Sequence, residues 1–266
     1  MNNDDQPIGH ILTRREALVL LGSASLGAAF LAACGDDPPA PAGNSSATGT
    51  PTATGTEAAA TASATAAVAV PSCIVRPALT EGPFFVDEKL NRSDIRIEPS
   101  DNSAIGGIPL VLTFNVASIA PNACNALAGA MVDVWQCDAA GWYSDVQDGA
   151  ADTRGKKFLR GHQVTDASGK AQFTTIYPGW YRGRATHIHF KLRRTDAGKT
   201  SDFTSQLFFD EAISDEVFAK APYNKAGNRT RNTSDGIFQQ SGGKLLMALT
   251  KTATGYAGTF EIGLQA

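Results

Sequence analysis

Short runs of β-branched and aromatic residues, separated by clusters of turn-forming residues, recur along this sequence from residue 108 onward. In residues 186–192 (THIHFKL) polar and apolar side chains alternate, which is the pattern of a strand with one buried face. Similar runs occupy residues 108–116, 130–135, 171–176, 205–209 and 259–264. Several short strands with frequent turns are typical of an all-β sandwich or barrel, and only residues 210–220 (DEAISDEVFAK) indicate a helix.

The first 34 residues have the composition of an export signal rather than of a folded domain. Arg14 and Arg15 stand before an apolar run at residues 17–33, and the pair resembles a twin-arginine signal. The run ends in LAAC, which resembles a lipobox in which Cys34 becomes the lipidated first residue of the mature protein. An ordinary cleaved signal with a chance cysteine is the alternative. We expect a protein that is exported and either tethered to the outer face of the cytoplasmic membrane or secreted.

Residues 35–71 consist almost throughout of Ala, Thr, Ser, Pro and Gly, and they contain no large apolar residue to bury. Such a segment cannot offset the entropy of becoming ordered, so we expect a disordered tether. Residues 72–266 then provide the length of one folded domain. The formal net charge is -3 and there is no long basic run, so we expect no nucleic-acid partner.

Three cysteines, Cys73, Cys124 and Cys137, lie in the domain. In an oxidising compartment two of them can form a disulfide, which leaves one over. The short separation of Cys124 and Cys137 makes that pairing our mild preference, although the sequence leaves all three pairings open.

Two of the four histidines, His187 and His189, are separated by one residue. On a strand they project to the same side, where their imidazoles can reach one ion; a pair of half-exposed histidines without a ligand is the alternative. Tyr181 lies six residues before His187, and Tyr143 follows the turn at residues 138–141; taken singly, either tyrosine is more often a packing residue. Two phenolates with two imidazoles match iron(III), whereas structural zinc favours thiolates.

Four stretches of the chain together resemble the intradiol ring-cleavage dioxygenases, the family of catechol 1,2-dioxygenases and protocatechuate 3,4-dioxygenases. They are residues 132–145 (VDVWQCDAAGWYSD), 176–192 (IYPGWYRGRATHIHFKL), 205–209 (SQLFF) and 79–85 (LTEGPFF). The resemblance covers most of residues 73–210. It implies a β-sandwich core and an enzyme that uses O2 to cleave catechol-type diols to cis,cis-muconate-type dicarboxylates.

The resemblance also implies a mononuclear non-haem iron(III) cofactor and names the residues that serve it. The matching ligands are Tyr143, Tyr181, His187 and His189. Tyr181 corresponds to the tyrosine that leaves the iron when the substrate binds. Arg184 and Gln206 correspond to the residues that stabilise negative charge on the substrate ring during the reaction.

Several points stay open at the level of the sequence. The tether takes the place of the helical dimerisation segment of catechol 1,2-dioxygenases, so the oligomeric state is open, with a homodimer as one option, and so is the preferred catechol. A non-catalytic, surface-tethered binding module is the alternative function. Trp135, Trp142 and Trp180 could wall the site or pack in the core. His162 and Arg182 are interpreted as surface residues.

Overall fold

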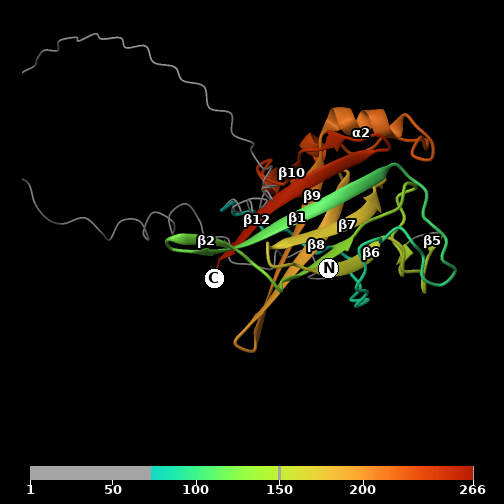
Figure 1. Cartoon of the computed structure of the whole chain (residues 1–266). Coiled ribbons are helices and arrows are strands. Elements are labelled where there is room, and N and C mark those ends of the chain that lie inside the picture. Colours follow the sequence, from blue (N-terminus) through green and yellow to red (C-terminus); the bar gives the residue numbers. More distant parts are fainter. Residues whose placement is uncertain (1–72, 149–150, 266) are drawn as a thin grey trace, which may run out of the picture. The chain divides into compact units, whose positions relative to one another are not determined.

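The computed structural model describes residues 73–148 and 151–265, which form two β-sheets packed face to face (Figure 1). The strands of the first, sheet A, are β10 (Leu246–Met247), β9 (Lys199–Phe209), β8 (His187–Asp196), β3 (Met131–Trp135) and β6 (Arg160–Val164), in that spatial order. The strands of sheet B are β11 (Thr250–Lys251), β12 (Tyr256–Gln265), β1 (Pro109–Ala120) and β2 (Ala123–Ala126), with β7 (Lys170–Ile176) also paired to β1. A separate two-stranded sheet consists of β4 (Gln147–Asp148) and β5 (Ala151–Asp152). All six predicted strands are present, and the prediction of an all-β sandwich is confirmed.

Strand β8 shows how the alternation of the sequence places the core on one side of sheet A. Ile188, Phe190 and Leu192 are completely buried. The ring of Phe190 packs against Phe114 of β1 and Phe260 of β12, with centroid distances of 5.2 and 5.6 Å. The intervening residues of β8 therefore face away from sheet B, and these include both predicted histidine ligands.

Sheet B is organised around β1, which pairs with β7 on one side and in parallel with β12 on the other. The parallel ladder runs from Leu110 opposite Tyr256 to Ile119 opposite Gln265. A side-chain bond supports it, because Asn115 Nδ2 donates to Glu261 Oε1 at 2.7 Å across 146 positions of the sequence.

Short helices cover one end of the sandwich. Helix α2 (Glu211–Phe218) confirms the helix predicted there, and Asp210 caps it by accepting from the backbone N–H groups of Ala212 and Ile213. Helix η2 (Asn232–Ser234) and helix α3 (Gly236–Gln240) follow, with Asp235 as the N-cap of α3. Within residues 73–148 and 151–265, we find no helix with the length and apolar character needed to cross a membrane.

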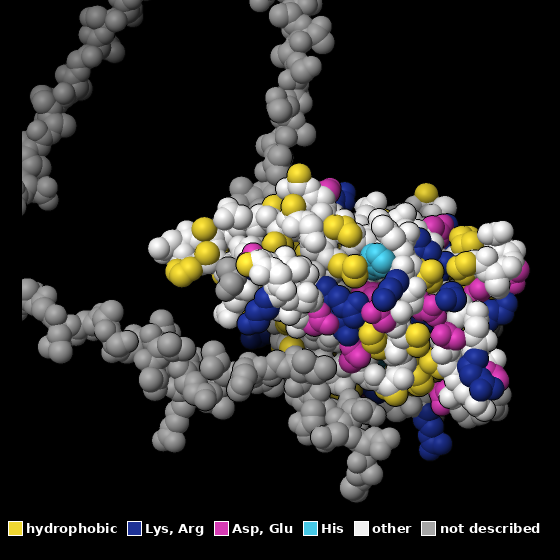
Figure 2. Space-filling view, turned by 90° about the horizontal axis from the view of Figure 1, so that it is seen from below, with side chains coloured by type: hydrophobic (Ala, Val, Ile, Leu, Met, Phe, Trp, Pro, Cys, Tyr) yellow, Lys and Arg dark blue, Asp and Glu magenta, His cyan; other side chains and the backbone are white. Residues whose placement is uncertain are grey.

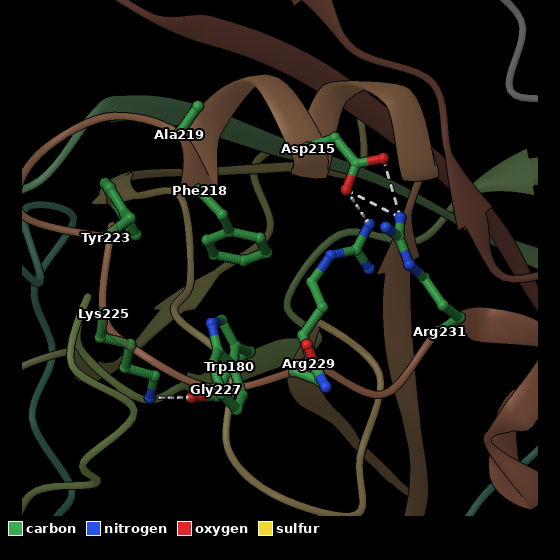
Figure 3. A pocket seen from close by; sticks show the side chains of 10 residues that line it. Trp180, Asp215, Phe218, Ala219, Tyr223, Lys225, Gly227, Arg229 and Arg231 are labelled. Atoms are coloured by element: carbon green, nitrogen blue, oxygen red, sulfur yellow. Dashed lines mark hydrogen bonds and ion pairs between the residues drawn. The ribbon is translucent and has the colours of Figure 1, made fainter.

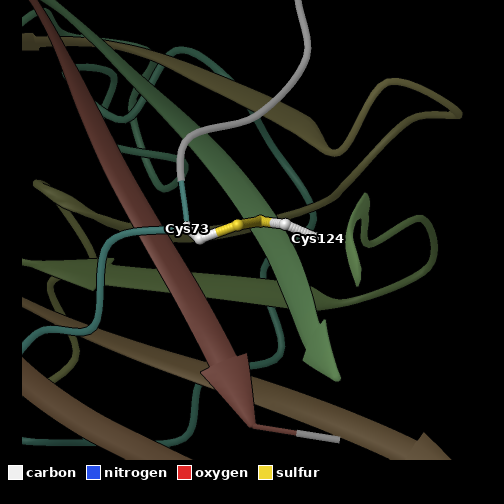
Figure 4. The surroundings of a disulfide bond; sticks show 2 residues. All are labelled: Cys73 and Cys124. Atoms are coloured by element: carbon white, nitrogen blue, oxygen red, sulfur yellow. A yellow bond between two sulfur atoms is a disulfide. The ribbon is translucent and has the colours of Figure 1, made fainter. Parts of the chain in front are cut away.

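A disulfide joins Cys73 to Cys124, with the Cα atoms 5.7 Å apart (Figure 4), and Cys137 is a buried free thiol. The preference for a Cys124–Cys137 pair is therefore wrong. Cys124 lies on β2 of sheet B, whereas Cys137 follows β3 of sheet A, so closeness in sequence does not bring them together. The predicted signal (residues 1–34), the tether (residues 35–71) and Cys34 lie outside the described residues.

Residues 73–85 belong to no helix or strand and contain a turn at residues 83–84; we call this segment the N-terminal strap. Near its start, the Gly263 N–H of β12 donates to Ile74 O at 2.8 Å. Further along, the Leu79 N–H donates to Thr204 O of β9 at 3.0 Å. The strap thus passes from sheet B to sheet A, and it ends at the predicted metal ligands.

Candidate metal centre

Three segments of the fold bring the four predicted ligands to the face of sheet A that points away from sheet B. His187 and His189 begin β8, Tyr181 lies in the connection from β7 to β8, and Tyr143 lies in the loop after β3. That loop contains a tight turn in which Asp138 Oδ1 accepts from the backbone N–H of Trp142 at 2.9 Å. The turn returns the chain toward the sheet, so that Tyr143 is only 3% exposed.

The donor atoms of the four side chains meet around one imidazole nitrogen. His187 Nε2 lies 3.0 Å from His189 Nε2, 3.2 Å from Tyr181 Oη and 3.4 Å from Tyr143 Oη. Ligands bound at roughly 2.0–2.2 Å from one metal ion lie roughly 3 Å from each other. The distances from His187 Nε2 to the other three donors therefore fit shared binding of a single ion.

Burial and hydrogen bonding prepare the two histidines to act as neutral ligands. The Nδ1–H of His187 donates to Ala185 O at 2.6 Å, which leaves the lone pair of Nε2 directed into the site. Burial, helped by the charge of Arg184, lowers the pKa of His187 to about 3, and burial places the pKa of His189 well below its ordinary value. Trp135 stacks on His189 with a centroid distance of 4.9 Å and an interplanar angle of 9°, which fixes the plane of that ring.

The two phenols need a strong positive charge beside them in order to ionise. Burial raises the pKa of Tyr181 to about 12 and that of Tyr143 well above its ordinary value. A trivalent cation bound by these residues would supply that charge, since opposite charges favour the ionised form. The donor set of two hard oxygens and two neutral imidazoles thus fits iron(III).

The N-terminal strap forms one wall of the site. Phe84 stacks on Tyr143 with a centroid distance of 4.5 Å. Gly82 adopts a φ of +73°, and a Cβ atom added there would lie 3.3 Å from His189 Cε1. The strap therefore restricts the positions of a tyrosine and a histidine ligand, and at Gly82 only glycine combines this backbone conformation with so close an approach.

Arg184 and Gln206 lie together beside the ligands. Gln206 of β9 stands directly opposite His189 of β8, and its Nε2 donates to Thr80 O of the strap at 2.9 Å. Arg184 Nη2 donates to Gln206 Oε1 at 2.5 Å, and its Nε donates to Asp235 Oδ2 at 3.0 Å. The structure thus gathers all six residues singled out from the sequence for the site, while Cys34 lies outside the described chain.

A row of charged side chains continues the outer face of sheet A beyond the ligands. Asp133 of β3 stands opposite Lys191 of β8 on one side and His162 of β6 on the other. Burial raises the pKa of Asp133 to about 7, although Arg193 and Lys191 act in the opposite direction. Figure 2 shows acidic and basic side chains intermixed around a histidine on one face of the molecule.

The interpretation of His162 as a surface residue is wrong, because the residue is only 8% exposed. Its backbone N–H donates to Leu90 O at 2.8 Å, and its carbonyl accepts from the Arg92 N–H at 3.1 Å. The segment at residues 90–92 therefore covers the edge of β6, and no local pattern of the sequence predicts this contact. Arg182, by contrast, is exposed, as expected.

The three tryptophans differ in their surroundings. Trp135 contacts His189, whereas Trp142 is 40% exposed. Trp180 lines a separate hollow of about 440 Å³ together with Phe218, Tyr223 and Lys225 (Figure 3). None of the four ligand residues lines that hollow, so Trp135 is the tryptophan that the structure places against the site.

Comparison with known proteins identifies the family. A family model described as Dioxygenase matches residues 80–254. A chlorocatechol 1,2-dioxygenase from Pseudomonas putida is 28% identical over 120 residues, which cover 38% of this chain and 42% of that protein. The solved structure of an intradiol ring-cleavage dioxygenase from Tetranychus urticae is 32% identical, with a TM-score of 0.61, over 73% of this chain and 94% of that one. The dioxygenase domain of a dioxygenase and carbohydrate-binding fusion from Streptomyces sp. SirexAA-E is 29% identical, with a TM-score of 0.51, over 73% and 99% of the two chains. The chain belongs to the intradiol ring-cleavage dioxygenase family.

Two residues at the site are absent from the sequence-based set. Arg160 is 2% exposed, and its Nε donates to the hydroxyl of Ser144, the neighbour of Tyr143, at 2.9 Å. Asp235 accepts from Arg184 across 51 positions of the sequence. The sequence signal at Asp235, an acidic residue before Gly-Ile-Phe, indicates a helix cap but not this contact.

Proposed function

We propose that this protein is a non-haem iron(III) dioxygenase that cleaves catechol-type diols with O2 between the two hydroxylated carbons. The products are cis,cis-muconate-type dicarboxylates. One observation carries the proposal: the phenol oxygens of Tyr143 and Tyr181 and the Nε2 of His189 all lie within 3.4 Å of His187 Nε2. Family membership supports the reaction class.

Bound iron(III) supplies the Lewis acidity and the electron acceptor that a catechol needs in order to react with O2. The two tyrosines have different parts in binding the substrate. Tyr143 is buried at 3% exposure and held by the stacked ring of Phe84. Tyr181 is partly exposed, so it is the phenolate that can move aside and accept a proton from a hydroxyl of the arriving catechol.

Arg184 and Gln206 stabilise the negative charge that develops on the substrate. The Arg184 side chain is 18% exposed, and both its Nε and its Nη2 already have oriented acceptors. A permanent cation held in a site largely shielded from water interacts strongly with new charge, because little solvent must reorganise. Gln206 is completely buried and hydrogen-bonded at both ends of its amide, so it holds the Arg184 Nη2 group in place.

The proposal is tested with purified protein loaded with iron(III). We expect a red to burgundy colour from phenolate-to-iron charge transfer, and O2 uptake with a rise in muconate absorbance when catechol is added. His187→Ala should lose the iron and the colour. Iron-loaded protein that binds catechols without consuming O2 would instead indicate a non-catalytic binding module.

The role of Arg184 has its own variant and control. Arg184→Ala should keep the iron and lose about 10²–10³-fold in kcat, the range for removing one charge-stabilising donor. Arg182→Ala, in the same connection but exposed, should leave kcat unchanged. Equal rates for the two variants would show that Arg184 does not act on the reacting substrate.

We further propose that the protein is exported and held at the membrane by a lipid on Cys34. The Cys73–Cys124 disulfide supports an oxidising compartment, where such bonds persist. On cell fractionation, the wild type should be found with the membrane and Cys34→Ala in the soluble fraction. A wild-type protein already in the soluble exported fraction would favour the cleaved signal.

A further inference from the structure

Asp235 is a buried carboxylate, 2% exposed, that sits between Arg184 and the start of α3. Its Oδ2 accepts from Arg184 Nε at 3.0 Å and from the backbone N–H of Ala185 at 2.7 Å. Its Oδ1 accepts from the N–H groups of Ile237 and Phe238 at 2.7 and 3.1 Å. The two oxygens thus serve different elements, one in the site and the other in the helix.

The carboxylate is ionised in this position. Burial acts to raise the pKa of Asp235, but the charge of Arg184 and the N–H donors outweigh it, and the pKa lies below its ordinary value. A charged acceptor holds its donors at shorter range and more strongly than a neutral one. The Arg184 guanidinium therefore has a strong, fixed partner at Nε, next to the Gln206 contact at Nη2.

The contacts continue from Asp235 to one of the ligands. The N–H of Ala185 donates to Asp235, and the carbonyl of Ala185 accepts from His187 Nδ1 at 2.6 Å. Because that last bond selects the tautomer and direction of the imidazole, the position of the Ala185 backbone matters to the ligand. One carboxylate thereby touches both the charge-stabilising arginine and the segment that orients a histidine.

We propose that Asp235 is a positioning residue for the ring-cleavage reaction: its carboxylate fixes the direction of the Arg184 guanidinium and, through the Ala185 segment, that of the His187 imidazole. The inference rests on the proposed function, since Arg184 is the group that acts on the substrate. The competing role is that Asp235 only caps α3.

Asp235→Asn separates these roles because an amide has one acceptor oxygen. If that oxygen stays at α3, the NH2 group faces the donors of Arg184 and Ala185; if the amide turns round, the cap is lost. A matched control exists at Asp210, which caps α2 through Ala212 and Ile213 at 2.8 and 3.3 Å and has no arginine partner within the described chain. Asp210→Asn therefore reports the effect of weakening a cap alone.

We expect iron-loaded Asp235→Asn to lose about 10–100-fold in kcat, the range for residues that support a metal ligand, with a smaller change in KM. A chelator should also remove its iron faster than from the wild type. Asp210→Asn should match the wild type in both measurements. If Asp235→Asn does not fold by circular dichroism, Asp235→Ser replaces it, since serine keeps a capping oxygen.

A double-variant cycle gives the deciding result. In an Arg184→Ala background, Asp235→Asn should lower kcat by a smaller factor than in the wild type, because only the part of its action that passes through Ala185 and His187 remains. The inference is overturned if the two effects multiply, or if Asp235→Asn behaves as Asp210→Asn does. A wild type that turns over no catechol would instead overturn the proposed function, so the two failures are distinguishable.

Discussion

Removing the Cys73–Cys124 disulfide should destabilise the metal-free protein by about 4 kcal/mol, through its effect on the unfolded chain. The bond closes a loop with a sequence separation of 51. In the chain-entropy estimate, closing a loop of this size lowers the entropy of the unfolded chain by about 14 cal/mol/K, which corresponds to about 4 kcal/mol at room temperature. The folded protein should change little, because the strap also has backbone bonds to Gly263 and Thr204.

The measurement compares the free energies of unfolding of the wild type and of the double variant Cys73→Ser/Cys124→Ser in denaturant. Metal-free protein is required, since thiol reductants also bind and reduce iron. Reductant should bring the wild type to the stability of the double variant and should have no effect on the double variant, because Cys137 is already free.

A difference of less than about 1 kcal/mol between the two proteins would refute the reasoning, because the crosslink would then not restrict the unfolded chain. The iron content of the double variant tests the second half of the argument. If the double variant folds but no longer retains iron, the disulfide holds the strap against the ligands in the folded protein, contrary to our expectation.

Two further predictions concern the site and the row beside it. Gly82→Ala should lower the free energy of unfolding in denaturant by about 1–2 kcal/mol, because residue 82 has a left-handed backbone conformation. Gly129→Ala, at φ +79° with open space around it, should lower it by a similar amount. Only Gly82→Ala should also shift the visible absorption of the iron-loaded protein, and equal spectra would contradict the contact with His189. Burial raises the folded pKa of Asp133 from 3.8 to about 7, so between about pH 4 and pH 7 the folded state keeps a proton that the unfolded chain has released. The free energy of unfolding should therefore fall with rising pH, by up to about 1.4 kcal/mol per unit, and in Asp133→Asn that part of the slope should be absent; parallel slopes for the two proteins would show that Asp133 titrates normally.

The fold could be read from the sequence where strands carry a buried apolar face. The six predicted strands include β1, β8 and β12, whose Phe114, Phe190 and Phe260 form the core between the sheets. Strand β6 was not predicted because its sequence, RGHQV, has polar residues at positions that the structure buries. Those residues are buried by neighbours from distant segments, which local patterns do not reveal.

The site divides in the same way. The spacing of His187 and His189 follows from the period of a strand, so local sequence suffices for that pair. The two tyrosines and Arg184 followed from motifs that resemble the family. The pairing of Cys73 with Cys124 and the contact of Asp235 with Arg184 each join residues 51 positions apart, and only the assembled sheets bring them together.

The parallel pairing of β1 with β12 has a kinetic consequence. Closing a ladder whose partners are 146 positions apart costs the chain much conformational entropy, so this ladder forms slowly during folding. On the ribosome, both histidines emerge well before residues 256–265, which complete sheet B. We therefore expect the cofactor site to mature only after this ladder has closed.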